Sequence, residues 1–169
     1  ILPLNLIAVL STHQGSFRKE LFAFNSLQVS PSLSKIRSYT KMDTKTPVLT
    51  TKAPPPLPGI YSQAIIANGF VYCSGAVPMD AETGKIIDGD IQAHTHQCIK
   101  NLSAILEAAG TSLDKVVKVN VFLSNMDDFA KMNKVYSTYW GDIKPCRKCV
   151  AVKTLPLNTD LEIECTAVL

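Results

Sequence analysis

The chain has 169 residues, of which 46% are hydrophobic, with a formal net charge of +3 and a mean hydropathy of +0.13. This length and composition predict one packed domain and exclude a chain that is disordered throughout. Residues 42–169 hold 12 basic and 13 acidic side chains, so the positive excess belongs to residues 1–41. Because affinity for a phosphate backbone comes mainly from lysine and arginine, we expect no nucleic-acid partner.

The first 41 residues have the composition of a targeting segment. Residues 1–10 are apolar, residues 11–41 are rich in serine and threonine, and the whole stretch carries five basic residues and one acidic residue. This composition is typical of a transit peptide, and we expect delivery to the mitochondrial matrix. The alternatives are a disordered tail, or translation that starts at Met42 and gives a cytoplasmic form.

Neither the cysteines nor the apolar runs indicate an exported or a membrane protein. Five cysteines is an odd number in a domain large enough to fold without disulfides, which favours a reducing compartment. No apolar run approaches the roughly 20 residues that a membrane span needs, so we expect no membrane partner.

Residues 42–58 are interpreted as a proline-rich arm, and residues 59–169 as the folded domain. Prolines fix φ and remove hydrogen-bond donors, which predicts extended chain in the arm. Strands are expected at Tyr61–Ile66 and Phe70–Ser74, because Asn68-Gly69 between them carries the signal of a tight hairpin.

Two helices alternate with the remaining strands. Asp90 as N-cap and Gly110 as terminator bound a helix of about 18 residues. A second helix, capped by Asn125 or Asp127, is expected to end at Gly141. Its apolar stripe comprises Phe129, Met132, Val135, Tyr136 and Trp140. The remaining strands are expected at Val116–Leu123, with Val117, Val119, Val121 and Leu123 on one face, at Pro145–Val152 and at Leu161–Cys165.

The order β-β-α-β-α-β-β defines the expected fold class. An early hairpin and a late strand pair enclose the alternating helices, which predicts an α+β domain with a mixed β-sheet. Both helices are expected to pack on one face of that sheet.

Arg147 is the only arginine in residues 42–169, which contain eleven lysines. Guanidinium is a planar fork that grips a carboxylate or phosphate with two parallel hydrogen bonds and keeps its charge when partly buried. Arg147 is therefore our candidate substrate anchor. The alternative is a structural ion pair with Glu162 or Glu164.

Glu162 and Glu164 share one face of their strand, because residues two apart alternate to the same side. A partly buried carboxylate there could hold a water and move a proton. The alternative is a solvated strand face, which suits at least one of the two.

Other motifs are weak. Cys146-x-x-Cys149 lacks a second half-site for zinc, and the rings of His94 and His96 lie about 200° apart on a helix, so His94 is expected in the core. Ser74-Gly75 could bring bare backbone to a ligand, or could simply end a strand. With no glycine-rich phosphate loop, we expect no cofactor and no metal.

Several segments of the chain carry further motifs. In chain order they are Gly59-Ile-Tyr61-Ser-Gln63, Val71-x-x-Ser74-Gly75-x-x-Pro78, Asn101 through Ala109-Gly110, Val117-Lys118-Val-x-Val121-Phe122-Leu, Phe129-x-x-Met-Asn133-x-x-Tyr136, and Pro145-x-Arg147 with Leu161-Glu-Ile-Glu164. Through these motifs the chain resembles the Rid (YjgF) family of enamine and imine deaminases, most closely its RidA subfamily, over about residues 50–169.

The resemblance implies a chorismate-mutase-like fold and a homotrimer with active sites between subunits. It implies a 2-iminobutanoate/2-iminopropanoate deaminase, which hydrolyses 2-aminoacrylate and related compounds to 2-keto acids and ammonia without a cofactor. Arg147 would bind the substrate carboxylate, and Glu162 rather than Glu164 would position the attacking water. The residues that would line the cleft are Tyr61, Ser74, Gly75, Asn133 and Cys149.

The chain departs from the family pattern at Cys146, where alanine is usual, and at Lys148, where a small residue is usual. Lys148 should point away from Arg147, so we expect the anchor to survive. Some family members are endoribonucleases that inhibit translation, and others act as chaperones. A single-strand endoribonuclease and a chaperone-like trimer are therefore the alternative functions.

Overall fold

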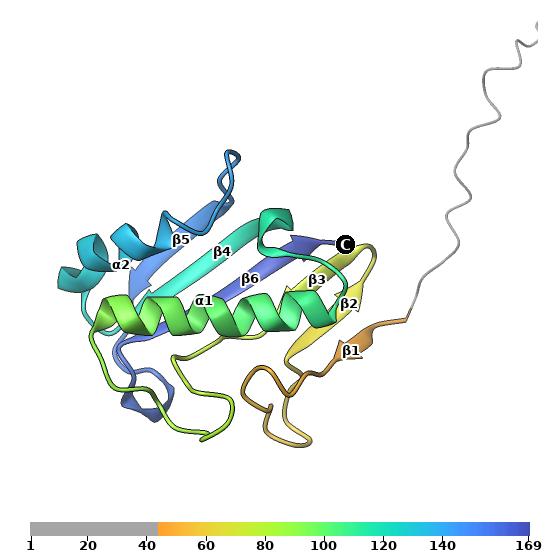
Figure 1. Ribbon diagram of the computed structural model, residues 1–169, viewed down its shortest axis with the longest axis horizontal. Coiled ribbons are helices and arrows are strands. Elements are labelled where there is room, and N and C mark those ends of the chain that lie inside the picture. The colour runs from red at the N-terminus through yellow and green to blue at the C-terminus, as the bar shows by residue number, and fades with distance from the viewer. Residues whose placement is uncertain (1–43) are drawn as a thin grey trace, which may run out of the picture. The chain divides into compact units, whose positions relative to one another are not determined.

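The computed structural model describes residues 44–169, so the expected targeting segment lies outside the described residues. These residues form one six-stranded sheet (Figure 1). The strands are β1 (Thr46–Val48), β2 (Ala64–Ala67), β3 (Phe70–Cys73), β4 (Val116–Leu123), β5 (Cys146–Ala151) and β6 (Leu161–Val168). Their spatial order is β1-β2-β3-β6-β4-β5, and all neighbours are antiparallel except β4 and β5, which are parallel.

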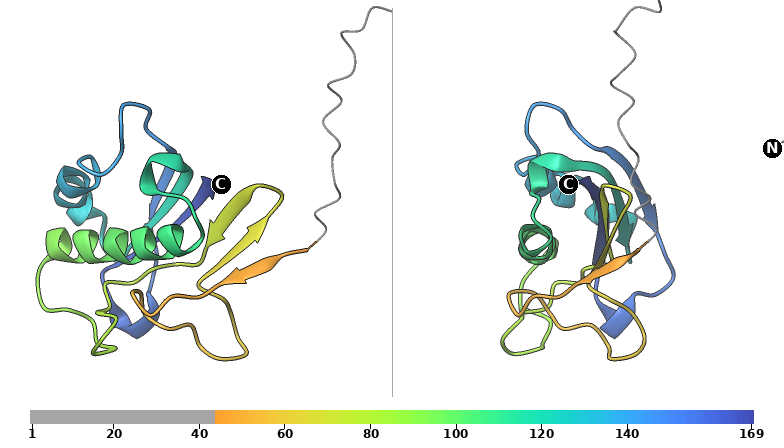
Figure 2. Two further views of the ribbon diagram at one scale, coloured as in Figure 1. Left: turned by 45° about the vertical axis from the view of Figure 1, so that its right-hand side comes forward. Right: turned by 90° about the vertical axis from the view of Figure 1, so that its right-hand side faces the viewer.

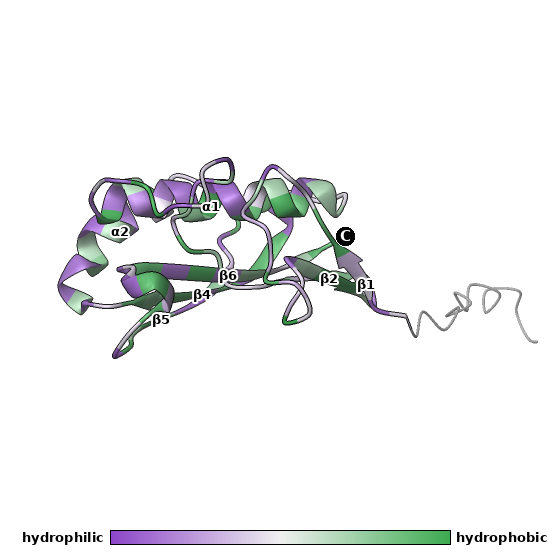
Figure 3. Ribbon diagram, turned by 90° about the horizontal axis from the view of Figure 1, so that it is seen from below, coloured by the Kyte–Doolittle hydropathy of each residue, from purple (hydrophilic) through white to green (hydrophobic). Residues whose placement is uncertain are grey.

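Helices α1 (Ile91–Ala108) and α2 (Phe129–Tyr136) lie on the same face of the sheet (Figures 2 and 3). Asp90 begins α1 as predicted, because its side chain accepts hydrogen bonds from the backbone N–H groups of Gln92 and Ala93. Gly110 follows the helix with a φ of 86°, a left-handed conformation that suits glycine. The α+β class, the mixed sheet and the one-sided helices are confirmed.

The core lies between the helices and the sheet. Alternate residues of β4 and β6 point into it, and α1 supplies one apolar stripe. The large side chains that are fully buried include Val71, Ile99, Leu102, Leu106, Val119, Val121, Leu123, Met132, Leu161 and Ile163. Three of the five free cysteines, Cys73, Cys98 and Cys165, are buried in it as well.

The predicted element order lacked one strand. Thr46–Val48, in the expected arm, pairs with β2 and forms the outer edge of the sheet. Pro47 hides this strand in the sequence, but an edge strand tolerates proline because one side of its backbone needs no partner. The side chain of Gln63 secures the following loop by donating to the carbonyls of Thr50 and Pro54.

Three predicted element boundaries were also wrong by three or more residues, and one side chain that was predicted to face the core is exposed. The second strand begins at Ala64, not Tyr61, and β6 continues to Val168. Helix α2 ends at Tyr136, because the Thr138 hydroxyl and N–H both bond the carbonyl of Val135 and form a tighter turn. Val117 is 40% exposed, since a bulge between Val116 and Lys118 gives the inward position to Val116.

Candidate functional site

Arg147 lies on the helix-covered face of β5, where its register partner is the core residue Val119. Its Nη1 donates a 2.5 Å hydrogen bond to Oδ1 of Asn133 on α2. The guanidinium carbon lies 4.7 Å from the ring centroid of Tyr136 and 5.4 Å from that of Phe129. Two aromatic faces and one amide therefore hold the fork in place.

No ion pair consumes this guanidinium within residues 44–169. Glu162 and Glu164 pair in register with Phe122 and Asn120, which project from the other face of the sheet. The structural ion pair that the sequence left open is therefore wrong. Most of the N–H donors of Arg147 remain available for a carboxylate ligand.

Cys149 lies two residues along β5, on the same face as Arg147, and is half-buried. Burial raises the pKa of its thiol, although the charge of Arg147 opposes this. A protonated thiol is a poor nucleophile, so this environment does not activate Cys149 for attack. Burial likewise raises the pKa of Tyr136 to about 12, so its ring stays neutral beside the cation.

Glu162 projects from the open face of the sheet, close to the end of β3. Burial raises the pKa of its carboxyl, and the charge of Glu164 raises it further. Glu164 is engaged, because Nδ2 of Asn120 donates a 2.6 Å hydrogen bond to its Oε1. Glu162 has no side-chain hydrogen bond within the described part of the chain, so it is the glutamate free to bind water.

Gly75 makes this position of Glu162 sterically accessible. A Cβ on residue 75 would lie 1.8 Å from Oε1 of Glu162, which no side chain can accommodate without displacing the carboxylate. The preceding Ser74 donates from Oγ to the carbonyl of Ser62 at 2.7 Å. Gly75 therefore does more than end a strand, because its bare backbone forms a wall against the carboxylate.

A cavity of about 520 Å³ adjoins Glu162. It brings together four of the seven predicted site residues, which are Tyr61, Ser74, Gly75 and Glu162. The other three, Arg147, Asn133 and Cys149, lie on the helix-covered face near α2. One chain thus carries two separate clusters, which we call the glutamate cluster and the arginine cluster. Glu162 and Arg147 project from opposite faces of the sheet, and the cavity beside Glu162 also reaches Asn101 and Ile105 of α1.

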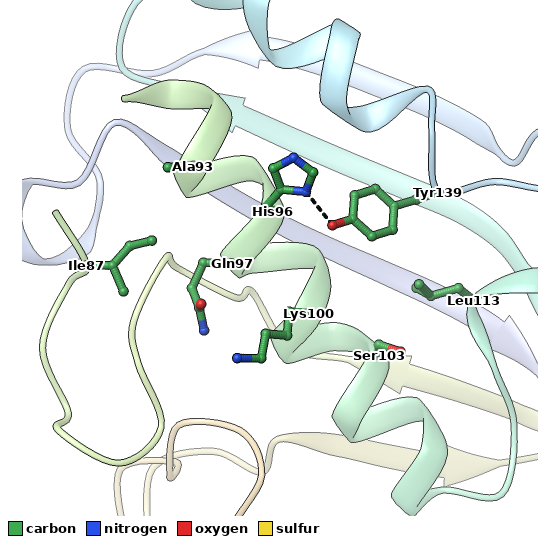
Figure 4. Close-up of a pocket in the computed structure, with 8 residues that line it drawn as sticks. All are labelled: Ile87, Ala93, His96, Gln97, Lys100, Ser103, Leu113 and Tyr139. Carbon is green, nitrogen blue, oxygen red and sulfur yellow. Dashed lines mark hydrogen bonds between the residues drawn. The ribbon is translucent and has the colours of Figure 1, made fainter. Parts of the chain in front are cut away.

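A second pocket, of about 500 Å³, follows the outer side of α1 (Figure 4). His96 and Lys100 line it, and the ring of His96 hydrogen-bonds the Tyr139 hydroxyl. His94 instead is buried, between Asp160 Oδ1 at 2.7 Å and the Ile87 carbonyl at 3.0 Å, which confirms its expected core position. This pocket contains none of the predicted site residues.

The described residues contain no cluster of three or more metal-binding side chains. No helix among them is long and apolar enough to cross a membrane.

Two features of the site escaped the sequence analysis. Phe129 and Tyr136 were predicted as parts of an apolar stripe and of a family motif, but their contact with the guanidinium was not predicted. Leu157 lines the cavity with a φ of 57°, a left-handed conformation that is rare for leucine. No residue pattern marks that conformation.

Fold and clusters together define a small α+β domain with an anchored arginine and a free, half-buried glutamate on opposite faces of one sheet. The family model described as Endoribonuclease L-PSP matches residues 50–169. The chain belongs to the Rid/YjgF/L-PSP family.

Individual relatives agree with this assignment. Mitochondrial protein mmf1 of Schizosaccharomyces pombe is 52% identical over 130 residues, covering 75% of this chain and 78% of the relative. The chloroplastic Reactive Intermediate Deaminase A of Arabidopsis thaliana is 40% identical, covering 86% and 73%. The crystal structure of Escherichia coli TdcF with bound serine matches with a TM-score of 0.69 and 34% identity, over 73% of this chain and 98% of that one.

Proposed function

We propose that this protein hydrolyses 2-imino and 2-enamino acids, such as 2-aminoacrylate, to 2-keto acids and ammonia. An enamine first takes a proton on carbon and becomes an imine. Water then adds to the imine carbon, forming a C–O bond, and the C–N bond breaks as the nitrogen leaves as ammonia. No electron is gained or lost, so the chemistry needs only proton transfers and a bound water.

The observation that carries the proposal is that the chain holds both a guanidinium and a carboxylate with hydrogen-bonding capacity left for a ligand. The guanidinium of Arg147, held by Asn133 and two rings, suits the substrate carboxylate. Glu162 takes a proton from the attacking water and delivers it to the leaving nitrogen. The raised pKa of Glu162 brings it closer to the neutral range, where such a group both accepts and releases protons. A relative named Reactive Intermediate Deaminase A supports the same reaction.

The same geometry supports an active site that is shared with a second copy of the chain. Arg147 and Glu162 project from opposite faces of one sheet, so one protomer cannot present both to a molecule as small as 2-aminoacrylate. An arginine cluster of one protomer facing the glutamate cluster of its neighbour would complete the site. We therefore propose a homotrimer with its active sites between subunits.

The open face of the sheet supports self-association. No α-helix of the described chain covers it (Figure 3). It exposes Phe70, Tyr72 and Val168 on the neighbouring strands β3 and β6, and Val150 on β5, and Tyr72 is 47% exposed. Apolar side chains gathered on one face are typical of an interaction surface.

A mixing experiment tests site and assembly together. Arg147→Ala and Glu162→Gln are each expected to be inactive, whereas trimers re-formed from an equal mixture should recover activity in about a quarter of their sites. The readout is 2-keto acid release from 2-aminoacrylate that a pyridoxal-phosphate lyase generates in situ. A chain carrying both substitutions is the control. Full activity of either single variant would refute the proposed roles.

Mitochondrial delivery is the proposed location. It rests on the composition of residues 1–41 and on mitochondrial relatives such as mmf1 of Schizosaccharomyces pombe. A fluorescent fusion of the full chain that stays in the cytoplasm would contradict it.

A further inference from the structure

His94 joins three segments that are far apart in the chain. It lies in the first turn of α1 and is 9% exposed. Its Nδ1 lies 2.7 Å from Oδ1 of Asp160, the residue before β6, and its Nε2 lies 3.0 Å from the carbonyl oxygen of Ile87, in the loop before α1. Two polar contacts on different sides of a buried ring fix its orientation. The reaction proposed above does not use this histidine.

The two contacts determine how many protons the ring of His94 carries. A carboxylate and a carbonyl oxygen are both acceptors, whereas a neutral imidazole has only one N–H group. A neutral ring would therefore set one nitrogen lone pair against an oxygen lone pair. An imidazolium donates to both oxygens, and imidazole is a stronger base than a carboxylate. His94 and Asp160 thus form an ion pair whose side chains are 11% and 28% exposed.

Asp160 carries this constraint to the start of β6, where Glu162 is the second residue of the strand. The backbone carbonyl of Asp160 accepts a hydrogen bond from the N–H of Ser124 at 2.9 Å. The hydroxyl of Thr159 lies 3.5 Å from Oδ1 of Asp160, which is long for a hydrogen bond. The contact with His94 is short and joins two charges, so within the described residues it is the strongest side-chain contact of Asp160.

Ile87 carries the same constraint to the other side of Glu162. The N–H of Ile87 donates to the carbonyl of Pro78 at 3.0 Å, which closes the loop before α1. The chain just before this loop is paired with β6, because Ala76 and Ile163 exchange two backbone hydrogen bonds of 2.8 and 3.0 Å. Both chain segments beside Glu162 are therefore fastened to one imidazolium.

From these contacts we infer that His94 is a positioning residue, which as an imidazolium bound to Asp160 and Ile87 holds the start of β6 and with it Glu162. The inference rests on the proposed deaminase function, in which Glu162 acts on the attacking water. Arg147 is held by other residues, on α2, so the substrate carboxylate keeps its anchor when His94 is replaced. Replacement of His94 should therefore lower kcat and leave KM nearly unchanged.

Substitutions in the full-length protein test this role by steady-state release of keto acid from 2-aminoacrylate. His94→Gln removes the cation, and Asp160→Ala removes its partner. Each should lower kcat roughly tenfold with KM within about twofold, because a displacement of about 1 Å near the reacting atoms has effects of at least this order. The double variant should lose no more than either single variant, since the two residues act as one unit. His96→Gln is the matched control, on the exposed side of the same helix.

Two NMR measurements test the same role without relying on activity. At pH 7 both ring nitrogens of His94 should carry protons in the wild type, whereas in Asp160→Asn only one should, because the new amide can donate to the other. Burial raises the pKa of the Glu162 carboxyl in the native fold. His94→Gln should bring this pKa down toward its ordinary value, since a displaced carboxylate is better solvated, whereas loss of the cationic charge alone would raise it.

The outcomes separate the role of His94 from the function on which it rests. A neutral ring in the wild type would overturn the ion pair. Unchanged kcat in His94→Gln, additive losses in the double variant, or a Glu162 pKa that stays or rises would overturn the positioning role. Failure of the wild type to accelerate keto-acid release would refute the deaminase, and the NMR measurements would still decide the role of His94. Asp160→Ala provides the same comparison if His94→Gln does not fold.

Discussion

Replacing Arg147 by lysine tests whether the shape of the cation, and not only its charge, holds the substrate. Lysine keeps the positive charge but offers a single ammonium in place of a planar fork. In the native site, Nη1 already bonds Asn133, while the guanidinium lies 4.7 Å from the Tyr136 ring centroid. Lysine cannot satisfy the amide, the ring and a bidentate carboxylate together.

The expected loss follows from the hydrogen bonds that disappear. A hydrogen bond to a charged group contributes about 1.5–3 kcal/mol, which corresponds to a roughly 10- to 150-fold fall in kcat/KM. The fold should survive, because lysine keeps a cation beside the two rings, so the net loss of ring and amide contacts is about 2 kcal/mol. The corresponding fall in Tm is roughly 5–10 °C.

Steady-state keto-acid release and thermal unfolding would be measured on three variants. Arg147→Lys keeps the charge, Arg147→Met removes it, and Lys153→Met is a control at an exposed position just after β5. If the fork matters, both Arg147 variants lose activity, whereas the control does not. Retention of wild-type kcat/KM within about threefold by Arg147→Lys would refute the reasoning.

Three further predictions concern Glu162, its glycine wall and the hairpin. The pKa of Glu162 is raised above 4.5, so the folded protein ionises this carboxyl less readily than the unfolded chain does. The free energy of unfolding therefore falls as pH rises from 4.5 through the folded-state pKa. Glu162→Gln should therefore unfold at a higher temperature than the wild type at pH 7 while losing at least about 100-fold in kcat; an unchanged or lower Tm would contradict the sign. Gly75→Ala should displace the Glu162 carboxylate and lower kcat at least about tenfold, whereas Gly141→Ala, whose Cβ would meet Asp114 at an ordinary 3.5 Å, should not. Gly69→Ala, at a φ of 78° in the β2–β3 turn, should lower the free energy of unfolding by about 1 kcal/mol in urea titrations, and no change would show that the turn relaxes.

The proposed deaminase and a ribonuclease differ in electrostatics. Residues 42–169 carry no net positive charge, although the matching family model is described as an endoribonuclease. Single-stranded RNA binding that weakens steeply with salt would favour the ribonuclease alternative. A chaperone-like trimer would keep its function when Arg147 and Glu162 are replaced together.

The amino-acid sequence by itself predicted most of the local elements and named the candidate site residues. Asp90 and Gly110 bound α1 through capping and a left-handed φ, and Asn68-Gly69 forms the predicted turn, because these signals act within a few residues of chain. The single arginine and the paired glutamates were likewise visible from residue type and alternation.

Only the tertiary structure decided where these residues lie relative to one another. The register of β4 between β5 and β6 places Arg147 and Glu162 on opposite faces of the sheet. Asn120 donates a hydrogen bond to Glu164 and leaves Glu162 without one. Strand β1, the bulge that exposes Val117 and the left-handed Leu157 all depend on distant partners or loop closure. Pairing between segments far apart in the chain leaves no local pattern in either segment, so it becomes visible only once the sheet is assembled.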